Sequence, residues 1–233
     1  CELIPIDSKT NIIEIGPGNG SLTEFLIKNN PKSLTLIEKD RELAKKLQGD
    51  YKDNDKIKIK NEDALDFNYD TLKIEGNVVI VGNLPFNVSS QLLVKWLSVE
   101  KWPPFYSRMI LMFQKEVAER IVSKHNNKSY GRLSVISQAR CKVEKKLTAP
   151  AKIFFPTPKV DGMIIDFKPI INKKNVNFNK LKKILKKAFS QRRKKISTNL
   201  KEHIKIIEEL NINKNLRAEN ISVEDYCKLA NRS

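Results

Sequence analysis

The chain has 233 residues, of which 40% are hydrophobic and 30% are charged. This length suits one large domain or one medium domain with a small appendage, and the composition excludes a membrane protein and a disordered one. No apolar run approaches the ~18 residues that a membrane span requires. The three cysteines lie far apart and the chain has only two histidines, so we expect free thiols and no metal site.

The positive charge is distributed unevenly along the chain. Residues 1–70 hold 11 basic and 14 acidic residues, whereas residues 171–233 hold 17 basic and 6 acidic ones, a net charge of +11 out of a total of +17. A general bias of the composition towards lysine would also give the first seventy residues a positive net charge, which they lack. The pattern therefore predicts a polyanionic partner that is bound mainly by the C-terminal part.

The first half of the chain alternates short apolar strands with helical segments, which is typical of βαβ units on a parallel sheet. Strands are predicted at residues 12–15, 34–37, 57–59, 78–81 and 109–113. Helices are predicted at residues 21–28, with Ser21 as N-cap, and at residues 41–47, 92–97 and 114–124. Later apolar stretches at residues 133–139, 143–147 and 163–167 are expected to be antiparallel strands that complete the sheet.

A polar joint at residues 169–179 marks the expected domain boundary. Beyond it, apolar residues with helical spacing predict an amphipathic helix over residues 181–189, which Ser190 to Lys195 are expected to continue. Shorter helices are expected at residues 203–210 and 223–230. The fold class is therefore α/β, with a Rossmann-like domain over residues 1–170 and a small basic helical domain over residues 171–233.

Polar residues follow the first three predicted strands. Gly16 and Gly18 come after the first strand, Glu38 after the second and Asp63 after the third. Ligands of open α/β sheets bind at these carboxyl ends, where Glu38 could accept hydrogen bonds from ribose hydroxyls and Asp63 from an adenine amine. The alternative is that these residues bind no ligand: the glycines would form a tight turn, Glu38 would be a solvated carboxylate and Asp63 would cap a turn or helix. The GxGxG spacing fits a dinucleotide-binding loop poorly.

The fourth strand is followed by Asn83-Leu84-Pro85-Phe86. An aromatic amine is a poor nucleophile because its lone pair is delocalised into the ring. The Asn83 side-chain oxygen and the Leu84 carbonyl could accept hydrogen bonds from both of its N–H groups, and Pro85 would stiffen the turn. Phe86 could stack on the base, which is worth roughly 1–3 kcal/mol in single-strand binders. The alternative is a strand-ending turn with a buried phenylalanine.

These segments resemble the small-subunit rRNA adenine N6-dimethyltransferases, which use S-adenosylmethionine to dimethylate two adjacent adenines in an rRNA hairpin. The resemblance runs from about residue 10 to the C-terminus. The matching motifs are EIGPGNG (14–20), IEKD (37–40), NEDAL (61–65), NLPFNVSS (83–90), FQKEVAERI (113–121), YGRLSV (130–135), FFPTPKVDG (154–162) and AFSQRRKKISTNL (188–200).

The resemblance implies two groups of site residues. The residues that would line the cofactor site are Gly16, Gly18, Glu38, Asp63 and Asn83. The residues that would hold the target adenine are Asn83, Leu84 and Phe86, with Phe154 on its other face. The family usually has tyrosine at the position of Phe86, and stacking needs only the ring. The family also begins with a basic stretch and a Q-N/H-F-L motif that nothing before Glu2 matches, so we expect a chain truncated at its N-terminus.

The basic run Arg192, Arg193, Lys194 and Lys195 matches phosphate geometry and is predicted to bind RNA. A-form RNA is recognised largely by shape and backbone, so a basic helical domain could grip a stem while the sheet edge takes a flipped base. The expected partner is small-subunit rRNA in a pre-30S-like particle, without membrane or metal. We expect a monomer in the cytoplasm, or in an organelle matrix if a transit peptide is missing.

Three other interpretations remain open. The chain could be a methyltransferase-like ribosome-assembly or mitochondrial transcription factor with secondary or lost activity. It could be a large-subunit rRNA methyltransferase of the macrolide-resistance type, which shares the catalytic motifs. A nicotinamide-dependent reductase is disfavoured by the glycine spacing and by the lack of a Tyr-x-x-x-Lys pair.

Overall fold

The computed structural model describes residues 3–85, 87–154, 157–171 and 176–233. The chain divides into two compact units, which are described separately. The first comprises residues 1–95, 104–115 and 144–168, and the second comprises residues 96–103, 116–143 and 169–233. The chain enters the second unit for the last time at Pro169, beside the boundary expected from the sequence, but that unit also takes two earlier stretches. The division of function between residues 1–170 and 171–233 therefore stays a prediction.

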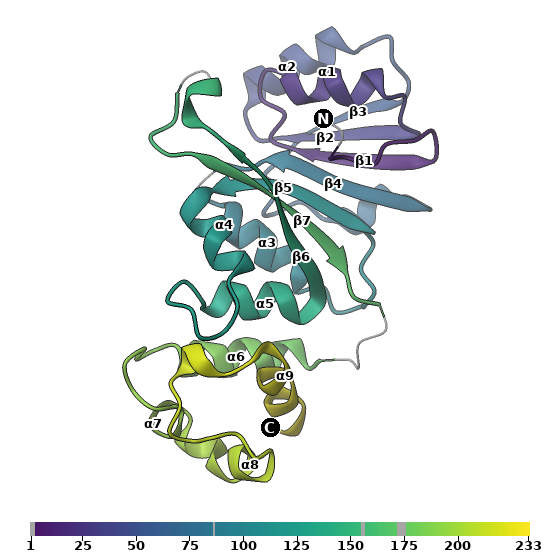
Figure 1. Ribbon diagram of the computed structural model, residues 1–233. Coiled ribbons are helices and arrows are strands. Elements are labelled where there is room, and N and C mark those ends of the chain that lie inside the picture. Colours follow the sequence, from purple (N-terminus) through teal and green to yellow (C-terminus); the bar gives the residue numbers. More distant parts are fainter. Residues whose placement is uncertain (1–2, 86, 155–156, 172–175) are drawn as a thin grey trace. The chain divides into compact units, whose positions relative to one another are not determined.

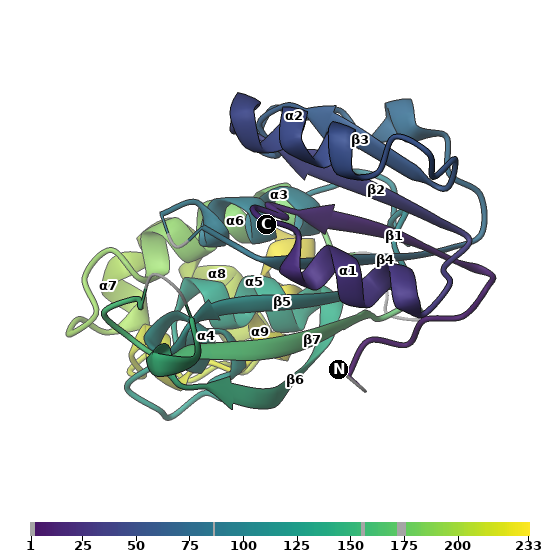
Figure 2. The ribbon, with the colours of Figure 1, turned by 90° about the horizontal axis from the view of Figure 1, so that it is seen from above.

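A seven-stranded sheet forms the centre of the first unit, with the order β3-β2-β1-β4-β5-β7-β6 (Figures 1 and 2). β1 to β5 are parallel, and β7 is antiparallel to β5. The strands are β1 (Thr10–Ile15), β2 (Ser33–Glu38), β3 (Ile57–Asn61), β4 (Asn77–Asn83), β5 (Arg108–Gln114), β6 (Cys141–Ala149) and β7 (Gly162–Pro169). All five predicted parallel strands and two of the three predicted later strands are confirmed.

Two helices, α1 (Ser21–Lys28) and α2 (Arg41–Asp50), cover one face of the sheet (Figure 1). Leu26 of α1 and Leu47 of α2 pack on strand residues that point to this face. Those strand residues are Ile12, Leu34, Leu36, Val79, Val81 and Ile110. Alternate residues are buried as well, as Ile13 and Ile80 show. Burial on both faces explains why these strands are continuous β-branched runs in the sequence.

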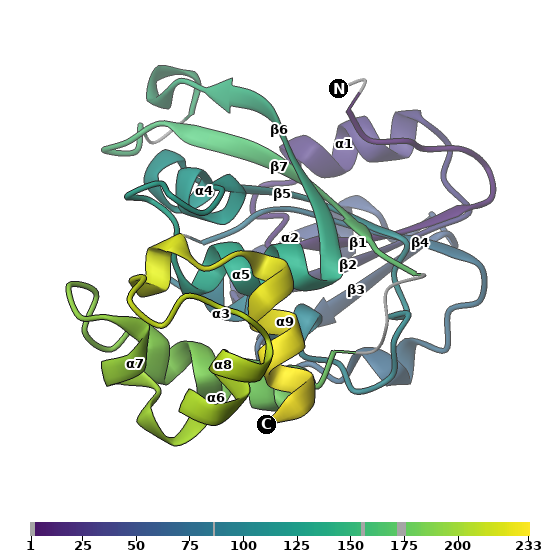
Figure 3. The ribbon, with the colours of Figure 1, turned by 60° about the horizontal axis from the view of Figure 1, so that its bottom comes forward.

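The second unit is helical (Figure 3). Within it α6 packs against α9, and the Phe189 ring lies 6.2 Å from that of Tyr130 and 5.9 Å from that of Tyr226. The remaining helices are α3 (Ser89–Leu97), which begins in the first unit, α4 (Lys115–Val122), α5 (Arg132–Arg140), α6 (Phe178–Ala188), α7 (Ile196–Asn199), α8 (Ile204–Glu209) and α9 (Val223–Arg232). Short 3-10 helices are η1 (Tyr69–Leu72), η2 (Ala151–Ile153), η3 (Lys201–His203) and η4 (Ala218–Asn220). No helix in the described part of the chain is long and apolar enough to cross a bilayer.

Three local predictions are wrong. Residues 133–139 are not a strand but lie in α5, where two small serines, Ser134 and Ser137, are buried together with the apolar residues. Gly20 rather than Ser21 precedes α1 as N-cap, with φ at +90°. The basic run does not continue α6, which ends at Ala188, where the Asn199 side chain donates to the Ala188 carbonyl at 2.6 Å in place of a further helical amide.

Candidate active site

The carboxyl ends of β3, β2, β1 and β4 meet along one edge of the sheet. Ile15 pairs with Ile37 on one side and with Gly82 on the other, and Glu38 pairs with Asn61. The residues that follow these strands therefore lie next to one another in the order of the strands. The structure places Gly16, Glu38, Asp63 and Asn83, the residues singled out from the sequence, along this single edge.

Glu38 holds the glycine loop. Its Oε2 accepts a hydrogen bond from the Gly18 amide at 3.0 Å, and its Oε1 accepts one from Asp40 at 2.9 Å. The amides of Gly16 and Gly20 donate to the carbonyls of residues 37 and 17. Three loop N–H groups are therefore used inside the protein. A phosphate cradle needs such groups for its ligand, so this geometry disfavours the reductase alternative.

The glycines of this loop adopt a conformation that side chains rarely allow. Gly16 and Gly18 have φ of +63° and +58°, and a Cβ on Gly18 would meet no atom within 4 Å. The left-handed φ explains why glycine stands there. The open space beside Gly18 lets another molecule approach the backbone closely.

Asp63 is held in a turn after β3. Its Oδ1 accepts from the Leu65 amide at 2.9 Å, and its Oδ2 accepts from the Lys39 ammonium at 2.7 Å. The hydrogen bond from Lys39 lowers the pKa of Asp63, so the carboxylate is ionised at neutral pH. Lys95 of α3 stabilises the same turn, because its ammonium donates to the carbonyls of Leu65 at 2.6 Å and Phe67 at 2.8 Å. No sequence motif indicated this role of Lys95.

Asn83 ends β4 and is exposed to solvent. Among the residues that the structure describes, none hydrogen-bonds to its side-chain amide, so this group is available to a ligand. The Leu84 side chain is buried and anchors the turn. A Cβ on Gly16 would lie 3.8 Å from Pro85 Cδ, so the turn after β4 lies against the glycine loop.

Gly82 allows this close approach between neighbouring strands. A Cβ at this position would lie only 2.8 Å from the Ile15 carbonyl oxygen, so no larger residue fits without a shift. Phe86, the expected stacking residue, lies outside the described residues.

Phe154, expected on the other face of the target base, lies directly after η2 and is partly buried. Asp161 holds the connection between β6 and β7. Its carboxylate accepts from the Ala151 amide and its carbonyl accepts from the Lys115 amide, both at 2.9 Å. Gln114, at the carboxyl end of β5, pairs with Gly162. The connection therefore joins β7 on the side of the sheet where the parallel strands end, which is the side on which Asn83 lies.

Glu14 is a buried carboxyl near the strand-end residues, and no role of its own was predicted for it from the sequence. It points from β1 into the interior with 1% of its surface exposed, and the Thr23 hydroxyl donates to its Oε2 at 2.7 Å. Burial raises the pKa of Glu14 to about 7; the bond from Thr23 opposes this shift and the charge of Glu38 adds to it. In the sequence, the feature that indicates a buried carboxyl is the single glutamate within the apolar run IIEI.

The four predicted RNA-binding cations have different surroundings in the second unit. The Arg192 guanidinium donates to the carbonyls of Lys128 at 2.7 Å and Tyr130 at 3.2 Å, and pairs with Glu219 at 3.1 Å. These contacts indicate that Arg192 stabilises the second unit. The remaining three cations of the run, Arg193, Lys194 and Lys195, are exposed.

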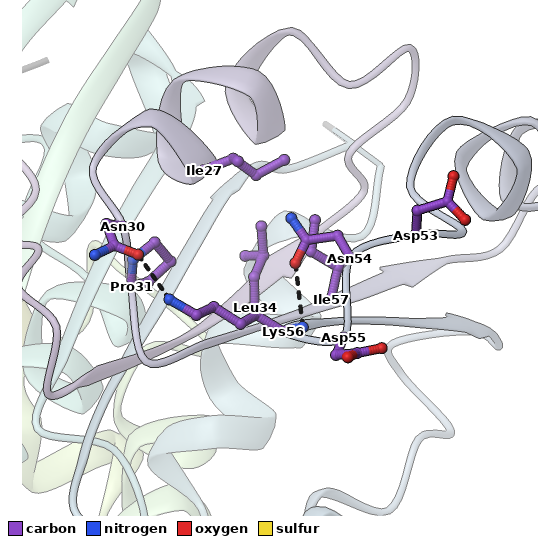
Figure 4. A pocket seen from close by; sticks show the side chains of 9 residues that line it. All are labelled: Ile27, Asn30, Pro31, Leu34, Asp53, Asn54, Asp55, Lys56 and Ile57. Atoms are coloured by element: carbon purple, nitrogen blue, oxygen red, sulfur yellow. Dashed lines mark hydrogen bonds between the residues drawn. The ribbon is translucent and has the colours of Figure 1, made fainter.

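A hollow of about 400 Å³ opens at the opposite edge of the sheet (Figure 4). Leu34 and Ile57, near the amino ends of β2 and β3, line it together with Ile27, Asn30, Pro31, Asp53, Asn54, Asp55 and Lys56. None of the predicted site residues borders this hollow, so it is separate from the strand-end site. In the described ranges, no three His, Cys, Asp or Glu side chains gather as a metal site would require.

The family model of ribosomal RNA adenine dimethylases matches residues 2–233. The chain belongs to this family. Membership confirms the resemblance that the motifs indicated, and with it the expected class of enzyme, an rRNA adenine dimethyltransferase.

Curated members of the dimethylase family resemble this chain over most of its length. The ribosomal RNA small subunit methyltransferase A of Ehrlichia canis (strain Jake) is 43% identical over 232 residues, which cover 96% of this chain and 86% of that protein. The protein of the same name from Wolbachia sp. subsp. Drosophila simulans (strain wRi) is 42% identical over 229 residues, with 95% and 82% covered.

Two solved structures share the fold. A dimethyladenosine transferase from Plasmodium falciparum has a TM-score of 0.82 at 25% identity, covering 96% of this chain and 90% of that one. The 23S rRNA methyltransferase ErmE has a TM-score of 0.72 at 20% identity, covering 99% and 93%. These likenesses confirm the predicted Rossmann-like methyltransferase fold.

Proposed function

We propose that this chain transfers methyl groups from S-adenosylmethionine to N6 of two adjacent adenines in a small-subunit rRNA hairpin. One observation carries the proposal: an exposed, uncharged amide, that of Asn83, stands at a strand end beside a glycine loop braced by Glu38. The names of the curated relatives favour the small subunit over the large one.

The strand-end residues fit this cofactor. Glu38 is acceptor-only and lies where ribose hydroxyls would reach it, and the space beside Gly18 is open. Asp63, whose pKa is lowered by Lys39, is an ionised acceptor for an adenine amine. The cofactor, when bound, supplies a methyl group on an activated sulfonium, so the protein has mainly to position the attacking amine, at about 3–3.5 Å from the methyl carbon.

The target amine is held by acceptors. The Asn83 Oδ1 and the Leu84 carbonyl accept from its two N–H groups, which draws the nitrogen towards a tetrahedral geometry and localises its lone pair. The amine would become cationic as its new C–N bond forms and the methyl–sulfur bond breaks, with a neutral thioether as the leaving group. A neutral amide stabilises that charge by its dipole, and the surplus proton leaves to solvent at this exposed position. Phe86 and Phe154 are proposed to stack on the two faces of the base.

The second unit is proposed to grip the RNA. Arg193, Lys194 and Lys195 are exposed, and residues 171–233 carry a net charge of +11. Phosphate contacts of this kind fix register and orientation rather than sequence. We place the chain, as a monomer, on pre-30S-like particles in the cytoplasm of a bacterial-type cell.

The test is transfer of labelled methyl groups to small subunits that lack the modification, compared with naked rRNA, followed by mapping of the methylated bases. Asn83→Ala should lower kcat about 10²–10³-fold, the magnitude observed when one transition-state hydrogen bond is removed. Gln48→Ala, which removes an exposed amide from α2, is the matched control.

Asn83→Ala with turnover within a few-fold of wild type would refute the acceptor mechanism. Binding of S-adenosylmethionine in calorimetry without any methyl transfer would instead favour a binding factor that has lost activity. Labelled adenines in the large subunit would favour the macrolide-resistance type of enzyme.

A further inference from the structure

A second hollow, of about 330 Å³, lies in the second unit, among α7, η3 and α8 and the segment that follows them. Its lining residues are Ser197, Lys201, Ile204, Lys214 and Asn215. They come from two stretches of chain about ten residues apart, and none of them is acidic. No motif singled out from the sequence contains the last two.

A short antiparallel pairing builds this hollow. The Ile196 amide donates to the Leu216 carbonyl at 2.7 Å, the Ser197 amide donates to the Lys214 carbonyl at 3.2 Å, and Lys195 forms an isolated bridge with Arg217. Buried apolar side chains, those of Ile196, Leu200 and Ile207, anchor the two sides. The pairing brings Arg217 alongside Lys195, the end of the basic run, and Lys214 alongside Ser197.

The polar groups that face the hollow are donors. The Asn215 Oδ1 accepts a hydrogen bond from the Lys195 ammonium at 3.0 Å, which leaves the amide nitrogen of Asn215 to donate. The Ser197 hydroxyl and the Lys201 ammonium are further donors.

Lys214 pairs with Glu208 at 2.6 Å, but the two side chains are 51% and 52% exposed. Exposed pairs of this kind are worth roughly 0–1 kcal/mol, so the Lys214 ammonium is readily redirected to an anion.

We propose that this hollow binds a single backbone phosphate of the rRNA substrate and extends the contact surface of Arg193–Lys195 as far as Lys201 and Lys214. The inference rests on the proposed function, since it assumes an rRNA substrate. A phosphodiester fits because it offers several acceptor oxygens and one negative charge to a set of donors. A single free anion in the hollow would leave the neighbouring exposed cations Lys194, Lys195 and Arg217 without a role. A continuous polyanion such as RNA would contact the hollow and these cations at the same time.

The experiment measures binding of unmodified small subunits at several salt concentrations. Lys201→Gln combined with Lys214→Gln should weaken binding about tenfold or more. The slope of log K against log salt should become shallower by about 0.7–0.9, the value for one lost phosphate contact. Affinity for S-adenosylmethionine should stay unchanged. Lys183→Gln combined with Lys228→Gln removes the same charge from α6 and α9 and should change both quantities less.

A second variant keeps the fold intact. Asn215→Asp has the same shape and still accepts from Lys195, but it replaces a donor by a carboxylate, so it should weaken RNA binding at least as much. If both hollow variants behave like the control pair while wild type methylates the subunit, the hollow proposal is wrong and the proposed function stands.

If wild type transfers no methyl group, the proposed function fails, and the salt slopes measured with naked rRNA still decide whether the hollow binds phosphate. Competition by polyglutamate as effective as that by RNA of equal charge would assign the hollow to acidic proteins and overturn the proposal.

Discussion

The buried carboxyl of Glu14 makes the stability of the protein depend on pH. Burial raises its pKa from 4.5 to about 7, with the Thr23 hydroxyl opposing and the charge of Glu38 adding to the shift. At about 1.4 kcal/mol per pKa unit, ionisation costs about 3 kcal/mol more in the native state than in the unfolded chain. The native state binds this proton more tightly, so its contribution to stability is complete below pH 4.5 and is lost as the pH rises through 7.

Glu14→Gln should abolish this dependence. The glutamine has the same shape, and its oxygen still accepts from the Thr23 hydroxyl. The free energy of unfolding of the variant relative to wild type should therefore rise by about 3 kcal/mol between pH 4 and pH 8, in favour of the variant. For a chain of this length that corresponds to a relative gain in Tm of roughly 6–12 °C.

The assay is urea unfolding of both proteins across this pH range, because all other titrating groups cancel in the difference. Glu24→Gln, which removes an exposed carboxylate from α1, controls for the loss of one negative charge. A difference between wild type and Glu14→Gln that stays constant within about 0.5 kcal/mol from pH 4 to pH 8 would refute the reasoning.

Three further substitutions test supports of the strand-end site and of the second unit. Gly82→Ala should destabilise the protein by about 1–3 kcal/mol in urea unfolding, because its Cβ would lie 2.8 Å from the Ile15 carbonyl oxygen. Lys95→Met should raise the KM for S-adenosylmethionine several-fold with a smaller effect on kcat in steady-state assays, because the Asp63 turn loses the hydrogen bonds that the Lys95 ammonium donates to it. Arg192→Gln should lower the free energy of unfolding by about 0.5–1.5 kcal/mol, because hydrogen bonds to two carbonyls are lost, while the salt slope of rRNA binding stays unchanged.

The sheet was predictable from the sequence because its physical signal is strong. Residues 78–81 and 109–113 are buried on both faces and are therefore continuous apolar runs. The placement of Gly16, Glu38, Asp63 and Asn83 at one edge then follows from the rule that parallel strands end on the same side. This placement does not depend on contacts between side chains that are far apart in the sequence.

The errors arise where a distant side chain decides the local structure. Nothing local shows that α6 must end at Ala188, because the carbonyl is satisfied by the amide of Asn199, eleven residues on. The role of Arg192 in RNA binding stays a prediction, but its internal partners are equally distant, because carbonyls from residues 128 and 130 bind its guanidinium. In α5 the buried serines resemble the polar positions of a strand, and only their packing distinguishes the two.

The contacts at the strand ends also explain why a neutral residue suits the reacting position. The carboxylates nearby have partners already: Glu14 is bonded to Thr23, Glu38 to the glycine loop and Asp63 to Lys39. They therefore position the loops and, for Glu38 and Asp63, the proposed cofactor, whereas the exposed amide of Asn83 can accept from an amine without taking its proton. A carboxylate in that place would attract a proton or a cation before the substrate arrived, and the lone pair that must attack the methyl group gains nothing from that charge. An acceptor of hydrogen bonds with no net charge is what the transfer requires, and the end of β4 presents one.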